Sequence, residues 1–336
     1  MINKTIVVIS NSSNPYHNQG LEEYLLNTLK PNTCILYLWQ NHNTVVIGRN
    51  QNPWQECRIK EMNAEGANLA RRLSGGGAVY HDEGNLNFTF ILPRQDYDEE
   101  KQTSVICQAV QNFGLHVEKT GRNDLTVNGK KFSGNAYFKR KDSAFHHGTL
   151  LINSDLTVLA RYLNVSNAKL QAKGVRSVSS RVCNLQEMCP EITVDKMKAS
   201  LTQALESVYG KKPLILTDAD FDDIALAKLE TRYASWEWRL GRKLPFQHNF
   251  TKRYIWGEIS FNFSVECGII NDVAVFSDAM DSTFISKLQT VLLNKPYSSN
   301  ALIETLAKLE LKNELGYEAN SAMLKDIEDL ILEQNF

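Results

Sequence analysis

Two adjacent arginines followed by three consecutive glycines are the groups in this sequence best suited to bind an anion. Arg71 and Arg72 are separated from Gly75-Gly76-Gly77 by only two residues. Arginine guanidiniums and the successive N–H groups of a glycine run both suit an anionic ligand. Glycines alone, however, are also typical of a loop that simply joins two strands. The segment is therefore a candidate anion-binding loop that needs support from a second segment.

A lysine and an aspartate further along the chain could provide that support. Asn128-Gly129 lies between two runs of β-forming residues and predicts a tight hairpin in which both turn residues adopt positive φ. The predicted pairs are Val127 with Lys130, Thr126 with Lys131, Leu125 with Phe132, and Asp124 with Ser133. Lys131 would then lie diagonal to Asp124 on the polar face, where it could stabilise a phosphoryl or acyl oxyanion. A solvent-exposed lysine near a turn is the alternative, and spacing alone favours it.

Histidines and a second glycine motif do not define a site by themselves. His146 and His147 are neighbours on a predicted strand and must point to opposite faces, so they cannot jointly hold a metal ion. His81-Asp82 has neither a visible nucleophile nor a third partner. Gly129-Lys130 lacks the upstream glycine and the following Ser or Thr of a P-loop.

The elements that must position these residues alternate between strands and helices. Asn14 followed by Pro15 predicts a helix start, and the following apolar stripe includes Leu21. Residues 86–92 alternate with period two and predict a half-buried antiparallel strand. The other expected strands are residues 5–10, a hairpin of 35–39 with 44–47, residues 69–72 and 78–81 on either side of the glycine loop, and 144–153.

The second half of the chain changes character. Helices are expected near 103–113, 156–163, 193–209 and 221–233, and the basic segment 171–181 is either a solvated connector or a flap that closes on an anion. Residues 241–245 form a predicted linker. A strand hairpin of 254–265 with 269–276 and three helices then predict a small α+β domain. The expected domains are residues 1–244 and 245–336.

Composition narrows the class of protein. With 37 Lys and Arg against 38 Asp and Glu among 336 residues, no bulk charge indicates nucleic acid or an anionic membrane as a partner. No stretch approaches the roughly 18 apolar residues that a membrane-spanning helix needs. The six cysteines lack metal-ligand spacing, which indicates reduced thiols in a cytoplasmic protein.

Several long motifs in the same order resemble the lipoate–protein ligase A family, in the biotin/lipoate ligase superfamily. They are Arg-Arg-x-Ser-Gly-Gly-Gly-Ala-Val-x-His-Asp-x-Gly-Asn at 71–85, Gly-Arg-Asn-Asp-Leu at 121–125, Lys-Phe-Ser-Gly-x-Ala-Tyr at 131–137, and Phe-His-His-Gly-Thr-Leu-Leu at 145–151. Trp39, residues 44–49 and residues 235–238 add to the resemblance, which covers essentially the whole chain.

The resemblance implies an α+β fold, with a mixed, mostly antiparallel sheet in a catalytic domain and a small α+β C-terminal domain. It implies that (R)-lipoate reacts with ATP to give lipoyl-AMP, and that the lipoyl group then passes to a lysine of an apo lipoyl domain. Such domains belong to the E2 subunits of 2-oxoacid dehydrogenases and to the glycine cleavage H protein. The enzyme is expected to be a monomer and to use Mg²⁺ with ATP.

By position in the motifs, the resemblance also implies roles for individual residues. Lys131 would be catalytic and contact both lipoate and phosphate. The implied ATP-binding residues are Arg72, Gly77, Ala78, Val79, Tyr80, Asn123, Asp124 and Lys131. The implied lipoate-binding residues are Arg71, Ser74, His81, Leu21, Trp39 and Lys131. Mg²⁺ would lie near the phosphates and Asp124.

Two other functions remain open at this point. An octanoyl or lipoyl transferase of the same superfamily would use a preactivated acyl donor, although its octanoyltransferase branch lacks the additional C-terminal domain. A non-catalytic protein that binds lipoyl domains is the alternative from another class. Biotin ligation fits less well, because the phosphate loop of biotin ligases is richer in arginine.

Overall fold

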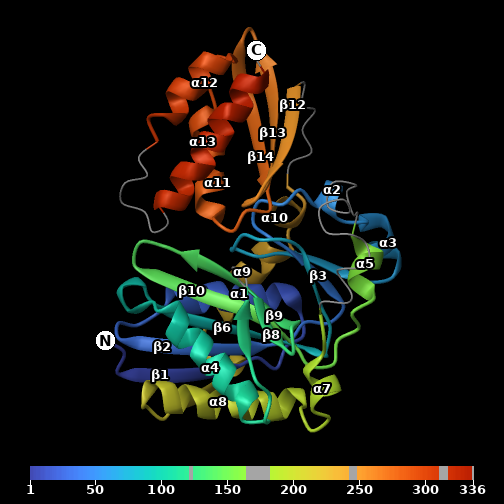
Figure 1. Cartoon of the computed structure of the whole chain (residues 1–336), viewed down its shortest axis with the longest axis vertical. Helices are drawn as coiled ribbons and strands as arrows, with labels where there is room; N and C mark the ends of the chain where they lie inside the picture. Colours follow the sequence, from blue (N-terminus) through green and yellow to red (C-terminus); the bar gives the residue numbers. More distant parts are fainter. Residues whose placement is uncertain (121–123, 164–181, 242–247, 310–316, 335–336) are drawn as a thin grey trace. The chain divides into compact units, whose positions relative to one another are not determined.

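A computed structural model describes residues 1–120, 124–163, 182–241, 248–309 and 317–334 (Figure 1). The chain divides into two compact units. Unit 1 contains residues 1–47, 53–72 and 78–241, and unit 2 contains residues 48–52, 73–77 and 242–336. The two short segments 48–52 and 73–77 therefore belong with the C-terminal part of the chain, which the sequence-based division at residue 244 does not anticipate.

Unit 1 is built on a mixed sheet of eight strands. The order is β11 (Leu214–Thr217), β1 (Lys4–Ile9), β2 (Thr33–Trp39), β6 (Asn85–Pro93), β10 (Ser143–Leu151), β9 (Lys130–Lys139), β8 (Asp124–Val127) and β7 (Glu118–Thr120). The first three strands are parallel, and every later pair is antiparallel. The expected α+β fold with a mostly antiparallel sheet is confirmed.

One face of this sheet forms the main hydrophobic core. Helices α4 (Glu99–Gln111) and α8 (Val194–Tyr209) pack their apolar residues against it. Phe88 and Phe90, on alternate positions of β6, are fully buried there. Thr193 caps α8, since its side chain accepts a hydrogen bond from the Lys196 N–H at 3.3 Å.

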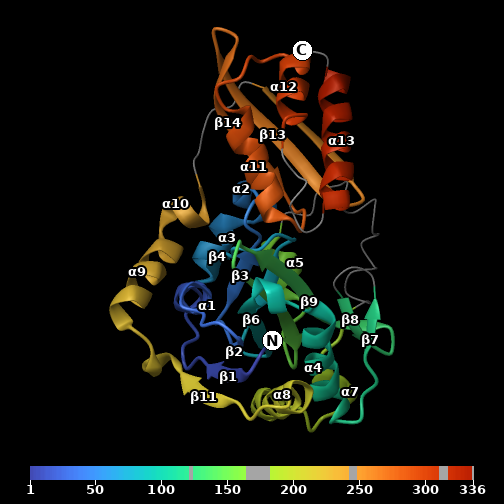
Figure 2. The ribbon, with the colours of Figure 1, turned by 90° about the vertical axis from the view of Figure 1, so that its left-hand side faces the viewer.

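The opposite face of the sheet is covered by helix α1 (Pro15–Asn27), and helix α9 (Asp223–Ala234) packs on the outer side of α1, as Figure 2 shows. The helix start at Pro15 is confirmed: the Asn14 side chain accepts a hydrogen bond from the Tyr16 N–H at 2.9 Å. The prediction that residues 86–92 form a half-buried strand is wrong, because β6 is buried along its whole length. Alternation in the sequence cannot reveal that a helix covers the polar side of the strand.

A second, smaller sheet carries the strands on either side of the glycine run. Its order is β4 (Asn68–Arg71), β3 (Thr44–Ile47) and β5 (Val79–His81), so the two predicted flanking strands are confirmed. The predicted hairpin of residues 35–39 with 44–47 is wrong, because β2 and β3 lie in different sheets. Both strands are fully buried, and tertiary packing selects their partners. Unit 1 also contains the short helices α2 (Pro53–Glu56), α3 (Ile59–Ala64), α5 (Val158–Tyr162), α7 (Leu185–Met188) and α10 (Trp236–Arg239).

Unit 2 is a three-stranded antiparallel sheet packed against helices. The strands are β12 (His248–Tyr254), β13 (Gly257–Glu266) and β14 (Ile269–Ser277), and the helices are α11 (Ser282–Leu292), α12 (Ser299–Leu306) and α13 (Tyr317–Gln334). The predicted hairpin of 254–265 with 269–276 is confirmed by the antiparallel pairing of β13 with β14, but its first strand begins at Gly257 rather than at residue 254. The chain turns before Gly257, whose φ of 148° suits glycine, and this turn separates β12 from β13.

Three further observations concern the helices, the cysteines and two predicted segments. Within the described ranges, no helix combines the length and the apolar character needed to cross a bilayer. All six cysteines are free thiols. The basic segment 171–181 and most of the predicted linker 241–245 lie outside the described residues.

Candidate functional site

Lys131 and Asp124 form an ion pair at one end of the main sheet. The Lys131 Nζ lies 2.6 Å from Asp124 Oδ1, and each side chain is about one-third exposed, at 33% and 37%. The tight turn at Asn128-Gly129 is confirmed by φ values of 52° and 73°. The predicted pairs Val127–Lys130 and Thr126–Lys131 are also confirmed.

The register beyond these two pairs differs from the prediction. Leu125 pairs with Ser133 and Asp124 pairs with Gly134, because a β-bulge adds one residue to β9. The extra residue is Phe132, which is fully buried in the main core. Packing of this aromatic side chain is a tertiary effect that the hairpin pattern cannot indicate.

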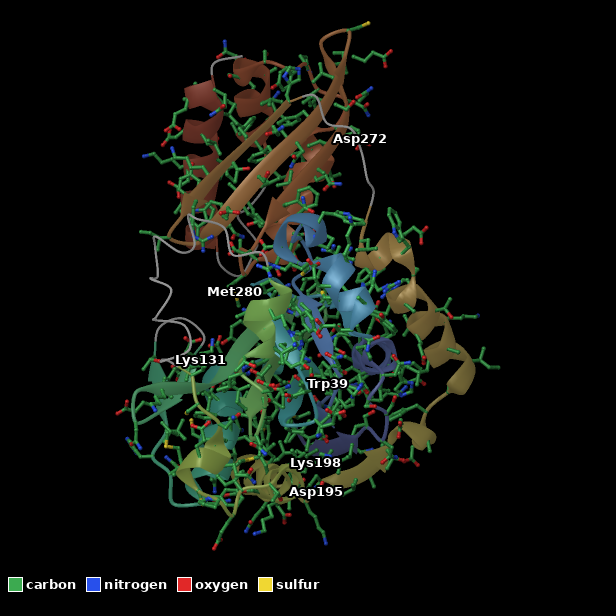
Figure 3. The ribbon with its side chains drawn as sticks, turned by 90° about the vertical axis from the view of Figure 1, so that its right-hand side faces the viewer. Trp39, Lys131, Asp195, Lys198, Asp272 and Met280 are labelled. Atoms are coloured by element: carbon green, nitrogen blue, oxygen red, sulfur yellow. The ribbon has the colours of Figure 1, made fainter. Side chains whose placement is uncertain are left out.

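Paired residues on adjacent strands share a face of the sheet, so the register defines a row across unit 1. Trp39 pairs with Asn87, which pairs with Thr149, and Asp124 pairs with Gly134. The link between the two halves is a hydrogen bond of 3.2 Å from the Gly134 N–H to Thr149 Oγ1. The ion pair and Trp39 therefore lie along one row of the α1-covered face. Figure 3 labels Lys131 and Trp39. With strands about 4.8 Å apart, β2 and β9 are roughly 14 Å apart.

A chain of buried hydrogen bonds lies on the same face. The Trp39 indole N–H donates to Thr89 Oγ1 at 3.1 Å, and the Thr89 hydroxyl donates to Glu22 Oε1 at 2.7 Å. His147 Nδ1 lies 2.8 Å from the same carboxylate oxygen. Glu22 is fully buried, so α1 places an acidic side chain inside unit 1.

Several polar atoms near this chain are buried without a hydrogen-bond partner among the described residues. They are Glu22 Oε2, both side-chain polar atoms of Gln19, His81 Nε2 and Asn87 Nδ2. A buried polar atom without a partner costs about 1–3 kcal/mol, and such atoms are commonly satisfied by ligands or ordered water. This set, which we call the polar chamber, is therefore suited to bind a ligand.

His81 contributes a neutral imidazole to the polar chamber. Burial, the larger cause, and the positive charge of Arg72 together lower its pKa to about 3. The His81 Nδ1 lies 3.2 Å from Asn41 Nδ2, and its ring packs edge-on against Trp39. His81 is thus held in place as a neutral side chain beside Trp39.

The two arginines have different surroundings. Burial lowers the pKa of Arg72 to about 10, while the Glu22 carboxylate opposes the shift. Its guanidinium donates to the Val46 carbonyl at 3.1 Å. Arg71 instead donates to the carbonyls of Trp238 and Arg239, both at 2.9 Å. Arg71 therefore holds the end of α10, whereas Arg72 places a positive charge close to Glu22 and His81.

The glycine run lies in unit 2 and is packed against the turn between β14 and α11. A Cβ on Gly75 would lie 2.3 Å from the Ala279 carbonyl oxygen and 2.4 Å from that of Met280. The Gly76 N–H donates to the Ala279 carbonyl at 3.1 Å, and Gly76 has a φ of 90°. Close packing within unit 2 thus explains two of the three glycines.

Gly77 differs from its two neighbours. It is exposed, and no atom lies within 4 Å of the position that its Cβ would occupy. Its φ is not in the left-handed region. The position that a Cβ of Gly77 would occupy is therefore open space.

The remaining predicted residues lie elsewhere in unit 1 or outside the described residues. Leu21 is fully buried on α1. Ala78 and Tyr80 are half-buried and pack against the core of the small sheet, with Val79 between them. The Tyr80 hydroxyl donates to Asn43 Oδ1 at 3.1 Å, and burial raises its pKa to about 12. Asn123 lies outside the described residues.

The structure therefore groups the predicted residues in three places. In unit 1, Trp39 connects to Glu22 through Thr89, His81 packs against Trp39, and the charge of Arg72 acts on both Glu22 and His81. Lys131 and Asp124 form the ion pair, and Ser74 and Gly77 belong to unit 2. Within the described part of the chain, no group of three or more His, Cys, Asp or Glu side chains could hold a metal ion. Five polar residues on α1 or on the α1-covered face of the main sheet were not among the predicted site residues: Gln19, Glu22, Asn87, Thr89 and His147. The available signal was an amide and an acid, three residues apart, beside the apolar stripe of a predicted helix.

Comparisons with known proteins agree on one family. The model of the lipoyl protein ligase A/B catalytic domain matches residues 14–206, and that of the bacterial lipoate protein ligase C-terminus matches residues 243–331. The lipoate-protein ligase A of Bdellovibrio bacteriovorus is 41% identical over 317 residues, which cover 92% of this chain and 94% of the relative. The lipoate-protein ligase A of Psychrobacter cryohalolentis is 38% identical over 312 residues, covering 88% of this chain and 90% of the relative.

A solved structure is similar over nearly the full length. It is the crystal structure of P. falciparum LipL1 in complex with lipoate, with a TM-score of 0.86 and 30% identity. The match covers 98% of this chain and 99% of that one. Sequence and structure comparisons thus both extend through the catalytic and the C-terminal parts.

Proposed function

Because the chain belongs to the lipoate–protein ligase family and is a ligase, we propose that it activates free (R)-lipoate with ATP and transfers the lipoyl group to a lysine of apo lipoyl domains. The observation that carries the proposal is the row of residues on the α1-covered face. It joins a positively charged Lys131 at one end to the polar chamber and Trp39 at the other.

This arrangement matches the two ends of lipoate. The Lys131 ammonium would hold the carboxylate, and the acyl chain would extend across the sheet past Leu21 toward Trp39 and His81. The roughly 14 Å between β9 and β2 leaves room for an extended eight-carbon acyl chain that ends in a dithiolane ring. Lipoate would also cover the polar chamber, with ordered water completing the hydrogen bonds of Glu22 and Gln19.

In the first step, the lipoate carboxylate oxygen attacks the α-phosphorus of ATP, and the bond from that phosphorus to the pyrophosphate oxygen breaks. Two anionic groups must approach each other, so a fixed positive charge beside them lowers the barrier. Lys131 and Arg72 supply positive charge, and no protein nucleophile is needed. The product is lipoyl-AMP, with pyrophosphate released.

In the second step, the amine of the acceptor lysine attacks the acyl carbon of lipoyl-AMP. The carbon–oxygen bond to AMP breaks, the attacking nitrogen loses a proton to the solvent, and the amide forms with AMP as the leaving group. Lys131 would stabilise both the acyl oxygen and the departing phosphate. The proposed acceptors are lipoyl domains of 2-oxoacid dehydrogenase E2 subunits and the glycine cleavage H protein.

ATP binding is proposed at Arg72, at Gly77 with Ala78, Val79 and Tyr80, and near Asp124. Gly77 supports this assignment, because the packing of unit 2 does not explain its missing side chain. Mg²⁺ would neutralise the charge of the ATP phosphates. Since protein sites for this ion often combine one or two carboxylates with phosphate oxygens, Asp124 fits as a ligand. We also propose a cytoplasmic monomer, which sedimentation analysis and cell fractionation would test.

The function is tested by mixing the purified full chain with an apo lipoyl domain, lipoate, ATP and Mg²⁺. Mass spectrometry is expected to show one lipoyl group added to the domain, only when both ATP and free lipoate are present. Pyrophosphate release in the absence of the domain would report the first step. Lys131→Ala is expected to lose both activities while remaining folded.

Three results would overturn the proposal. Transfer from a preacylated donor without ATP would identify a transferase. Binding of the lipoyl domain without any lipoate-dependent pyrophosphate release would identify a binding protein. Exchange of ATP with pyrophosphate at the wild-type rate in Lys131→Ala would remove Lys131 from the chemistry.

A further inference from the structure

Gly134 lies directly beneath the side chain of Lys131. A Cβ built on Gly134 would be 3.1 Å from Lys131 Nζ and 3.2 Å from its Cε. Both distances are shorter than normal van der Waals contact with carbon, so any side chain at residue 134 would displace the end of the lysine. The neighbour that would be moved is the ammonium that pairs with Asp124.

The β-bulge explains why these two residues meet. In a regular strand, residues three apart point to opposite faces. Here Phe132 and Ser133 both lie opposite Leu125 and are both fully buried, so the alternation shifts by one residue. Lys131 and Gly134 consequently share the α1-covered face, with no side chain between them on β9.

Asp124 sets the direction in which Lys131 extends. It pairs with Gly134 on the adjacent strand, and its Oδ1 lies 2.6 Å from the Lys131 Nζ. The lysine side chain therefore runs along the face from its own Cα, over Gly134, to the carboxylate of β8. The hydrogen bond from the Gly134 N–H to Thr149 Oγ1 ties the same residue to β10.

We propose that Gly134 is a positioning residue for the ligase reaction. Its missing side chain, together with the bulge at Phe132, leaves room for the Lys131 side chain to run along the sheet so that its ammonium lies beside Asp124. Only the kinetic consequence of this proposal rests on the function proposed above. Its structural part, contact between Lys131 and residue 134, stands independently of which reaction the chain performs.

The structural part is tested with a double-mutant cycle in urea unfolding, using Gly134→Ala, Lys131→Ala and the double variant. We expect the change in the free energy of unfolding caused by Gly134→Ala to be less favourable in the wild type than in the Lys131→Ala background. In that background the crowding is absent, and alanine suits a strand better than glycine. If Gly134→Ala prevents folding, the double variant should restore it. An equal effect of Gly134→Ala in both backgrounds would overturn the proposal.

Gly20→Ala is a matched control for crowding. Its Cβ would lie 3.2 Å from the backbone nitrogen of Glu230, a distance similar to those at Gly134. Gly20 belongs to α1, and its contact is with α9 rather than with Lys131. The effect of Gly20→Ala on unfolding should therefore be the same in the wild-type and Lys131→Ala backgrounds.

The kinetic part compares lipoyl transfer by the wild type and Gly134→Ala. A displacement of a charged group by a fraction of an ångström is expected to lower kcat by about tenfold, with the KM for the lipoyl domain little changed. An unchanged kcat would overturn the positioning role. If the wild type shows no ligase activity, the proposed function fails, while the unfolding cycle still decides whether Gly134 seats Lys131.

Discussion

The Glu22 carboxylate accepts a hydrogen bond of 2.7 Å from the Thr89 hydroxyl, which joins helix α1 to the polar face of the main sheet. Thr89 in turn receives the indole N–H of Trp39. A buried acid therefore organises side chains from a helix and two central strands. The second oxygen of the same carboxylate, Glu22 Oε2, has no hydrogen-bond partner among the described residues.

Removing this acid should destabilise the fold. Glu22→Ala removes the acceptor of the Thr89 hydroxyl and the carboxylate beside His147, and we expect the free energy of unfolding to fall by about 1–3 kcal/mol. Glu22→Gln should lose less, since an amide oxygen can still accept from Thr89. Urea unfolding measures both, and equal stability of the wild type and Glu22→Ala would contradict this account.

Acid should destabilise the protein through two buried histidines. Burial lowers the pKa of His81 and of His146 to about 3, from an ordinary value near 6.5. Between these values the unfolded chain binds protons that the folded chain does not, so stability falls as pH drops below about 6.5. Each histidine contributes a slope of up to about 1.4 kcal/mol per pH unit, and neither contributes above that range.

His146→Gln isolates one of these contributions. His146 lies between the side-chain amides of Gln102 and Asn135, at 3.2 Å and 2.8 Å, and glutamine keeps a polar group there. Urea unfolding at pH 7, 6 and 5 should show that the free energy of unfolding falls less steeply with decreasing pH in the variant. The difference in slope should approach the value for about one bound proton. The same slope in both proteins would mean that His146 titrates normally in the folded state.

Substitution by alanine should have different effects at the two ends of the glycine run. Gly75→Ala would place a Cβ 2.3 Å from the Ala279 carbonyl oxygen, so we expect a loss of stability of about 1–3 kcal/mol. Gly77→Ala meets no atom within 4 Å and should unfold like the wild type. Its predicted defect is weaker ATP binding, measured by calorimetry. Unchanged ATP affinity would remove Gly77 from the proposed ATP site.

The Lys131–Asp124 pair should matter more for activity than for stability. Both side chains are about one-third exposed, at 33% and 37%, and pairs of this kind contribute only about 0–1 kcal/mol. Asp124→Asn should therefore unfold nearly like the wild type but lower the rate of lipoyl transfer by roughly tenfold or more. Thermal unfolding and mass spectrometry of the lipoyl domain provide the two readouts. A large stability loss with normal transfer would contradict the assignment.

The amino-acid sequence by itself determined the local features of this protein. Asn14 and Pro15 specify the start of α1, and Asn128-Gly129 specifies a tight turn, because these residue types satisfy backbone requirements within a few positions. The order of the long motifs was also sufficient to indicate the family and, through it, the mostly antiparallel fold.

Only the tertiary structure decided the relations that depend on packing between distant segments. It assigned β2 and β3 to different sheets, covered the polar side of β6 with α1, and joined residues 73–77 to unit 2. It also buried Phe132, and the resulting bulge placed Lys131 over Gly134. Each outcome follows from contacts between residues far apart in the chain, and local spacing carries no information about such contacts.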